Sequence, residues 1–169
     1  MEDMANVQIA VTANDSDIDE LVEKMLSAGS NLLNLEYGIQ SRIEDNEYLV
    51  EYAISPNGEL VPGAKFELPN TYCEAVVKAQ KTTVYEEVRE IDYLQGHPVY
   101  VNMMLESYIS TPIWVDDKIY GTLNFSSNKS SSISKPLPSQ ILTFSTLPDE
   151  HLPNSMYNAT LVGDLASPP

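Results

Sequence analysis

The chain has 169 residues, 43% of them hydrophobic, which is enough for one buried core but too short for a sensor and a catalytic domain together. Its 25 acidic residues outnumber 9 basic ones and give a formal net charge of −16, which argues against docking on nucleic acid or on an anionic membrane. One cysteine leaves no internal disulfide, no apolar run approaches the roughly 18 residues of a membrane span, and the N-terminus is acidic. A cytoplasmic location is therefore expected.

The first predicted element is a helix over residues 17–35, preceded by an N-terminal extension of residues 1–16. Ser16 can cap this helix, and acidic residues in its first turn complement the helix dipole. Its apolar residues recur at helical spacing, at Ile18, Leu21, Val22, Met25, Leu26, Leu32 and Leu33. The runs Tyr37–Ile43 and Tyr48–Ile54 follow, and the turn residues between them predict a hairpin.

A short helix is predicted to begin at the segment TYC, residues 71–73. Thr71 and Glu74 have the spacing of a capping box ahead of an apolar run. Residues 83–88 have the composition of a strand, and residues 92–105 that of a loop with a short helix.

The strongest strand signal in the chain covers residues 106–127. A run of alternating side chains from Tyr108 to Val115 is followed by the turn residues Asp116 and Asp117 and by a second β-rich run, Lys118 to Phe125. This hairpin completes a predicted antiparallel sheet with helices on its faces.

Composition changes at the end of this hairpin. From Ser126 onward the chain carries six of its eleven prolines and ten serines, with only short apolar clusters. Such a composition predicts a domain boundary near residue 127 and a divergent, mostly irregular Ser/Pro-rich tail over residues 128–169.

Four segments resemble the GAF domain, in the branch found in bacterial and archaeal sensor histidine kinases. They are GIQSRIE at 38–44, PGAKFELPNTYC at 62–73, GHPVY at 96–100 and SYISTPIWVDDKIYGTLNFSS at 107–127. The resemblance covers residues 17–127 and implies an α/β (α+β) fold, a twisted antiparallel sheet of about six strands flanked by helices. It also implies a cytoplasmic sensory module that binds a small molecule and signals to a kinase or another partner, with a homodimer as one arrangement.

The resemblance also implies which residues form the ligand site. The expected ligand-binding set is Phe66, Leu68, Thr71, Tyr72, Cys73, His97, Tyr100, Tyr108, Pro112 and Asn124. The family normally continues after the last strand with an amphipathic helix on the back of the sheet, and the segment SSNKSSSISKPLPS stands in its place here. The back of the sheet is then left to the N-terminal helix, the tail or a partner.

Two of these residues have a bland interpretation beside the functional one. Cys73 at a helix start could be a reactive thiolate, but a small buried side chain is the favoured interpretation. His97, which precedes Pro98, could contact a ligand or make a hydrogen bond that anchors its loop. Among the ten tyrosines, Tyr48 and Tyr52 alternate on one strand face and fit ordinary sheet packing.

Other chemistry finds little support in the residues. No metal ligand spacing, GxSxG elbow or glycine-rich phosphate loop is present, so neither a metal site nor a catalytic residue is expected. A covalent bilin is not expected, because His97 is flanked by Gly96 and Pro98 while Cys73 lies elsewhere. The alternatives are a redox enzyme resembling free methionine-sulfoxide reductases, which would use Cys73, and a ligand-free protein-interaction domain.

Overall fold

A computed structural model describes residues 18–133, 140–146 and 157–163 of the chain. The helices are α1 (Ile18–Leu33), α2 (Cys73–Ala79) and α3 (Pro98–Met103). The strands are β1 (Tyr37–Glu44), β2 (Glu47–Ile54), β3 (Lys65–Glu67), β4 (Thr83–Tyr85), β5 (Ser107–Val115), β6 (Lys118–Ser127), β7 (Gln140–Thr146) and β8 (Tyr157–Gly163). Short 3-10 turns join several of these elements.

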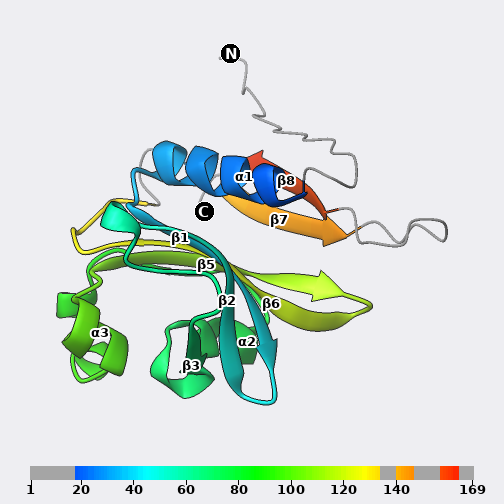
Figure 1. The fold of residues 1–169 in the computed structure, drawn as a ribbon. Coiled ribbons are helices and arrows are strands. Elements are labelled where there is room, and N and C mark those ends of the chain that lie inside the picture. The colour runs from blue at the N-terminus through cyan, green and yellow to red at the C-terminus, as the bar shows by residue number, and fades with distance from the viewer. Residues whose placement is uncertain (1–17, 134–139, 147–156, 164–169) are drawn as a thin grey trace, which may run out of the picture.

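The six strands β1 to β6 form an antiparallel sheet in the order β3-β2-β1-β6-β5, and β4 pairs with one end of β5. Helix α1 lies over one face of the sheet, whereas α2 and α3 lie on the other (Figure 1). This arrangement confirms the expected α+β fold with a sheet of about six strands. The core accordingly has two parts, one on each face.

Both predicted hairpins are present, and their turns explain their geometry. The turn residues Asp45 and Asn46 have φ of 47° and 71°, and Asp116 and Asp117 have φ of 49° and 58°. Two-residue hairpin turns of type I′ need positive φ at both central positions, and Asn and Asp tolerate this better than most residues. The turn chemistry thus fixes the register of β1 with β2 and of β5 with β6.

Helix α1 covers the back of the sheet, where the usual C-terminal helix of the resembled family would lie. Val22, Met25, Leu26 and Leu33 are buried against strand residues of β5 and β6. The cap expected from Ser16 and Asp17 lies outside the described residues. The cap predicted for α2 can be compared with the structure, whereas the cap predicted for α1 cannot.

The capping box predicted for α2 does not form, although the helix does. Tyr72 occupies the N-cap position in a helical conformation and makes no side-chain cap hydrogen bond. The hydroxyl of Thr71 donates instead to the carbonyl oxygen of Leu68, at 2.9 Å. The preceding 3-10 turn, Leu68–Asn70, thus takes the hydroxyl that the helix start was expected to use.

A β-bulge separates two tyrosines that the alternation of β2 places on one face. Tyr52 pairs with Gln40 but Val50 pairs with Ser41, so Glu51 is the extra residue. Tyr48 consequently belongs to the part of the core under α2, whereas Tyr52 packs against the part under α1. A bulge of this kind shifts the side-chain alternation by one residue.

Two strands lie in the segment that composition predicts to be irregular. β7 and β8 pair antiparallel over their full lengths, and β7 joins the main sheet through one parallel pairing, Trp114 with Ser145. Residues 140–146 and 157–163 are thus strands within the segment 128–169, for which composition predicts mostly irregular chain. The serine and proline content of this segment does not predict these two short strands, which pair chiefly with each other.

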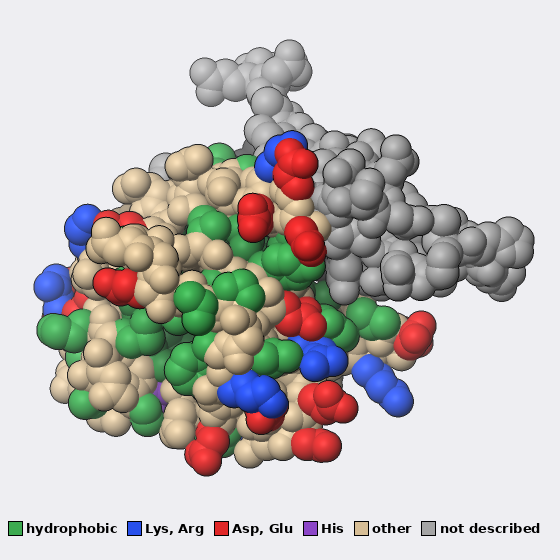
Figure 2. Space-filling view, viewed as in Figure 1, with side chains coloured by type: hydrophobic (Ala, Val, Ile, Leu, Met, Phe, Trp, Pro, Cys, Tyr) green, Lys and Arg blue, Asp and Glu red, His purple; other side chains and the backbone are tan. Residues whose placement is uncertain are grey.

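The surface mixes charges of both signs. Figure 2 shows acidic side chains beside most of the basic ones on the visible face, and ion pairs include Lys65 with Glu47 at 2.7 Å and Lys129 with Glu36 at 2.8 Å. Among the described helices, none combines the length and the apolar character needed to cross a membrane.

The packing of α1 gives a test of the fold. A methyl group added at Gly29 would overlap the ring of Phe125, which is fully buried. Overpacking costs about 1–3 kcal/mol and exceeds the roughly 1 kcal/mol that alanine gains over glycine in a helix, so Gly29→Ala should lower the melting temperature by a few degrees. Gly96→Ala, which meets no atom within 4 Å, is the control and should melt like wild type. A Gly29→Ala protein as stable as wild type would contradict this packing.

Candidate functional site

A cavity of about 330 Å³ lies between the sheet and the segments that cross it, on the face opposite α1. Its floor comes from four neighbouring strands: Tyr37 and Ile39 from β1, Tyr48 from β2, Tyr108 from β5, and Asn124 and Ser126 from β6. Alternate residues of a strand point to the same face, and the register aligns Ile39 with Asn124 and Tyr108 with Ser126. The side chains of four neighbouring strands thus reach the cavity from one face of the sheet.

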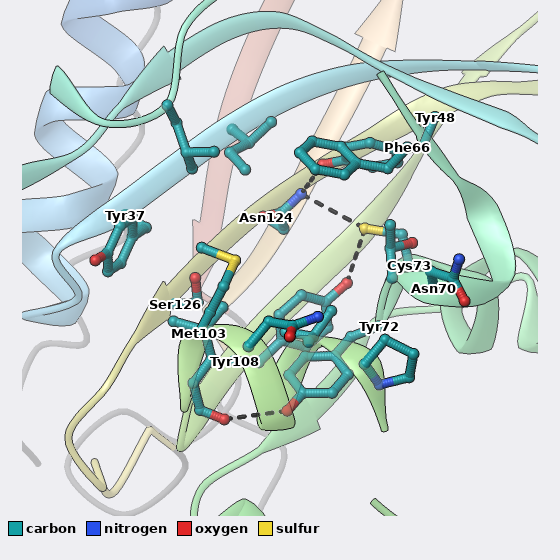
Figure 3. Close-up of a pocket in the computed structure, with 17 residues that line it drawn as sticks. Tyr37, Tyr48, Phe66, Asn70, Tyr72, Cys73, Met103, Tyr108, Asn124 and Ser126 are labelled. Carbon is teal, nitrogen blue, oxygen red and sulfur yellow. Dashed lines mark hydrogen bonds between the residues drawn. The ribbon is translucent and has the colours of Figure 1, made fainter. Parts of the chain in front are cut away.

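The roof comes from the segments around α2 and α3 (Figure 3). Asn70, Thr71, Tyr72 and Cys73 contribute one part, and Pro98, Val99, Asn102 and Met103 the other. The Tyr72 hydroxyl donates to the carbonyl oxygen of Leu105 at 3.1 Å, which ties the start of α2 to the chain just before β5. The rings of Tyr72 and Tyr108 also meet edge to face, with centroids 5.3 Å apart.

Cys73 lies at the centre of a buried polar cluster. The Thr122 hydroxyl donates to its sulfur at 3.2 Å, the Tyr108 hydroxyl lies 3.1 Å from it, and the Asn124 side-chain amide donates to it over 3.6 Å. The same amide group donates to the hydroxyl of Tyr48 at 2.9 Å (Figure 3). The cluster holds the sulfur and the ends of two tyrosines together against the sheet.

Burial keeps this cluster neutral. It raises the pKa of the Cys73 thiol, although hydrogen bonds from Thr122 and Tyr108 act in the opposite direction. It also raises the pKa of the Tyr48 and Tyr108 hydroxyls well above the ordinary value of a phenol. The thiol and both phenols are therefore protonated at neutral pH. A thiolate activated by the helix start, which the reactive interpretation of Cys73 needs, is not favoured here.

The structure brings six of the ten expected site residues to the cavity. Those that line it are Phe66, Thr71, Tyr72, Cys73, Tyr108 and Asn124. Leu68, His97, Tyr100 and Pro112 do not line it. Leu68 is buried in the core beneath α2, and the Tyr100 hydroxyl donates to Glu106 at 2.8 Å. Pro112 lies farther along β5, paired with Thr122.

His97 makes the loop-anchoring hydrogen bond that the sequence left as one of two alternatives. It has an extended conformation at the N-cap of α3, and its Nδ1 accepts from the backbone N–H of Val99 at 3.2 Å. Its ring lies 4.9 Å from that of Tyr72, and burial lowers its pKa. His97 thus supports the roof of the cavity through Tyr72 and α3.

Several lining residues were not expected from the sequence. Tyr48 fits ordinary sheet packing by its alternation, but its hydroxyl reaches the cluster around Cys73. Asn102 and Met103 lie on the six-residue helix α3, which is too short to show a periodicity. The segment GHPVY predicts a turn at the start of α3, but it does not predict which side chains of α3 face the cavity.

The cavity wall carries no full charge. None of its lining residues is Asp, Glu, Lys, Arg or His. Among the described residues, no group of three or more His, Cys, Asp or Glu side chains is placed to hold a metal ion. The wall instead combines aromatic rings with hydroxyl, amide and thiol groups, the usual lining of a small-molecule site.

A family model described as a GAF domain matches residues 15–136. A search of curated proteins found no match. Among solved structures, the chain is similar to the GAF domain of the Acinetobacter phosphoenolpyruvate-protein phosphotransferase, with a TM-score of 0.54 and 12% identity over 67% of each chain.

Two further solved structures show the same fold. NreA from Staphylococcus aureus, studied as a protein mutated in its nitrate binding site, gives a TM-score of 0.54 at 16% identity over 75% of this chain and 94% of its own. The red/green cyanobacteriochrome NpR6012g4 gives 0.53 at 12% identity, over 68% of this chain and 79% of its own. At identities this low, the structural similarity establishes a shared fold and nothing beyond it.

Tyr72 should prove to be a core residue as well as part of the cavity. It is 3% exposed and contacts the rings of Tyr85, Tyr108 and His97. Tyr72→Ala should therefore lower the free energy of unfolding by about 3–5 kcal/mol. Tyr72→Phe, which keeps the ring and loses one hydrogen bond, should cost only about 1 kcal/mol. Urea denaturation measures both, and equal stability of the alanine variant and wild type would contradict this role.

Cys73 should be unreactive in the folded protein. A thiol that is 3% exposed, with a raised pKa, reacts slowly with iodoacetamide at pH 8, because the thiolate is the nucleophile. Mass spectrometry should show little labelling in buffer and complete labelling in urea, with Cys73→Ser as the unlabelled control. Labelling in buffer at the rate seen in urea would show that the sulfur is exposed and ionised.

Proposed function

Because the chain belongs to the GAF domain family, we propose that it is a sensory or regulatory domain that binds a small molecule in the cavity between the sheet and helices α2 and α3. The observation that carries this proposal is the cavity itself. Its volume of about 330 Å³ falls in the range of small-molecule sites, and buried aromatic and polar side chains converge on it.

The proposal includes an effector, which is a partner protein. We propose that the domain acts in the cytoplasm and passes its signal to a partner, such as a sensor histidine kinase, with a homodimer as one arrangement. The chain's net charge of −16 favours a protein partner over nucleic acid or an anionic membrane. Helix α1 is a suitable element for such a contact, because it packs on β1, β2 and β6 from the side opposite the cavity.

Binding fits the site better than catalysis. A methionine-sulfoxide reductase would use Cys73 as the nucleophile and would need a second thiol to resolve the resulting sulfenic acid. The chain has one cysteine, and burial raises the pKa of its thiol. These features support a regulatory role, in which the cluster around Cys73 contributes to the wall of the binding site.

A ligand screen with two matched variants tests the proposal. Val99 lines the cavity, whereas Val101, on the same helix, is 64% exposed and does not. Val99→Trp should fill the cavity and Val101→Trp should leave it open. The probes are nitrate, cyclic nucleotides, amino acids, methionine sulfoxide and indoles, each tested by its effect on the melting temperature.

A probe at 100 times its dissociation constant should stabilise the protein by about 2.7 kcal/mol and raise its melting temperature by several degrees. This rise should persist in Val101→Trp and vanish in Val99→Trp. A rise that survives in Val99→Trp would place the ligand outside the cavity. No rise with any probe would favour a ligand-free protein-interaction domain.

A further inference from the structure

We propose that the ligand of this cavity is an uncharged molecule with a flat, aromatic body and one hydrogen-bonding oxygen, which lies against Asn124 on the floor. This inference rests on the proposed function, because it names the chemical class that the same cavity accepts. Three features of the wall carry it: its lack of charge, its aromatic rings and the weak hydrogen bonding around Cys73.

The absence of charge on the wall argues against a charged ligand. A buried ion needs an opposite charge or several strong hydrogen bonds to offset its loss of hydration. No lining residue carries such a charge, and the three carboxylates that directly follow lining residues each have a partner in the protein. Glu67 accepts from the side-chain amide of Asn70 at 3.2 Å. Glu74 pairs with Lys78 at 2.9 Å, and Glu106 accepts from the Tyr100 hydroxyl at 2.8 Å and from the Arg89 N–H at 3.0 Å.

The rings of the wall favour a flat, apolar body. Five aromatic side chains line the cavity: Tyr37, Tyr48, Phe66, Tyr72 and Tyr108. Tyr48 and Phe66 stand on one side of Cys73 with centroids 6.3 Å apart, and Tyr72 and Tyr108 stand on the other (Figure 3). Aromatic surfaces pack best against other rings, either edge to face or offset and parallel.

The polar cluster supplies a place for one oxygen atom. The Asn124 amide reaches the sulfur of Cys73 only at 3.6 Å, and sulfur is a weak acceptor. A ligand carbonyl or hydroxyl oxygen is a stronger acceptor for that N–H. Hydrogen-bonding capacity is therefore left over at this end of the site.

Four indoles of nearly equal shape separate charge from polarity. Indole-3-carboxamide is neutral with an acceptor oxygen, indole-3-carboxylate is its anionic isostere, 3-(aminomethyl)indole is cationic, and 3-methylindole is apolar. Dissociation constants come from NMR titrations of the full chain and of Val99→Trp, Val101→Trp and Asn124→Leu. Thermal melts confirm that each variant is folded before it is titrated.

The carboxamide should bind at least about ten-fold more tightly than the carboxylate and the amine, because neither ion finds a counter-charge. Asn124→Leu should raise the dissociation constant of the carboxamide about five-fold, because one hydrogen bond is lost. The dissociation constant of 3-methylindole should be nearly unchanged. Val99→Trp should abolish binding, and Val101→Trp should not.

Tighter binding of the carboxylate or the amine, abolished by Val99→Trp, would overturn the neutral class and leave the cavity as a ligand site. For the amine, it would indicate capture of a cation by the aromatic rings. Binding that survives in Val99→Trp would overturn both the inference and the site. Failure of all four indoles to bind would overturn the inference alone, if the wider screen had found a ligand sensitive to Val99→Trp.

Discussion

Strand β6 lies between β1 and β5, so both of its edges are hydrogen-bonded and its side chains must alternate between two covered faces. Leu123 and Phe125 point to α1, whereas Asn124 and Ser126 point to the cavity. The rest of the structure depends on this alternation, because a slip of one residue would bury the amide in the apolar core and put the ring of Phe125 into the cavity. The Asp116-Asp117 turn, which joins β5 to β6, holds β6 in the register that prevents such a slip.

The character of the cavity follows from the same constraint. Side chains from β1, β2, β5 and β6 reach its floor from a rigid sheet, so their polar groups are held at fixed separations. Cys73 reaches down to this floor from α2 in the roof, and three neighbours direct hydroxyl or amide groups at its sulfur. Burial keeps the thiol and the phenols protonated, and the result is a wall that is polar but uncharged. Such a wall discriminates between ligands by their shape and by single hydrogen bonds.

Much of the fold is readable from local signals. The apolar spacing of residues 17–35 predicts α1, and the turn pairs at Asp45-Asn46 and Asp116-Asp117 predict both hairpins. The site is harder, because it depends on features with no local signature. A bulge at Glu51 moves Tyr52 to the opposite face from Tyr48, and the hydroxyl of Thr71 bonds to Leu68 instead of capping α2. The strands β7 and β8 lie in a serine- and proline-rich segment, where composition outweighs two short apolar clusters.

The floor and the roof of the cavity differ in how much buried surface and hydrogen bonding stabilises them. Along the floor, β1, β5 and β6 are bonded to neighbours and buried on both faces. On the roof, α3 has six residues, none of them buried, with Val101 and Met104 more than 60% exposed, and it ends at Met104 in a left-handed conformation. An element with little buried surface opens at a lower free-energy cost than a paired strand. Entry of a ligand is therefore least costly past α3, where the hydrogen bond from Val99 to His97 and the tilted contact between the rings of His97 and Tyr72 set the resting position of the roof.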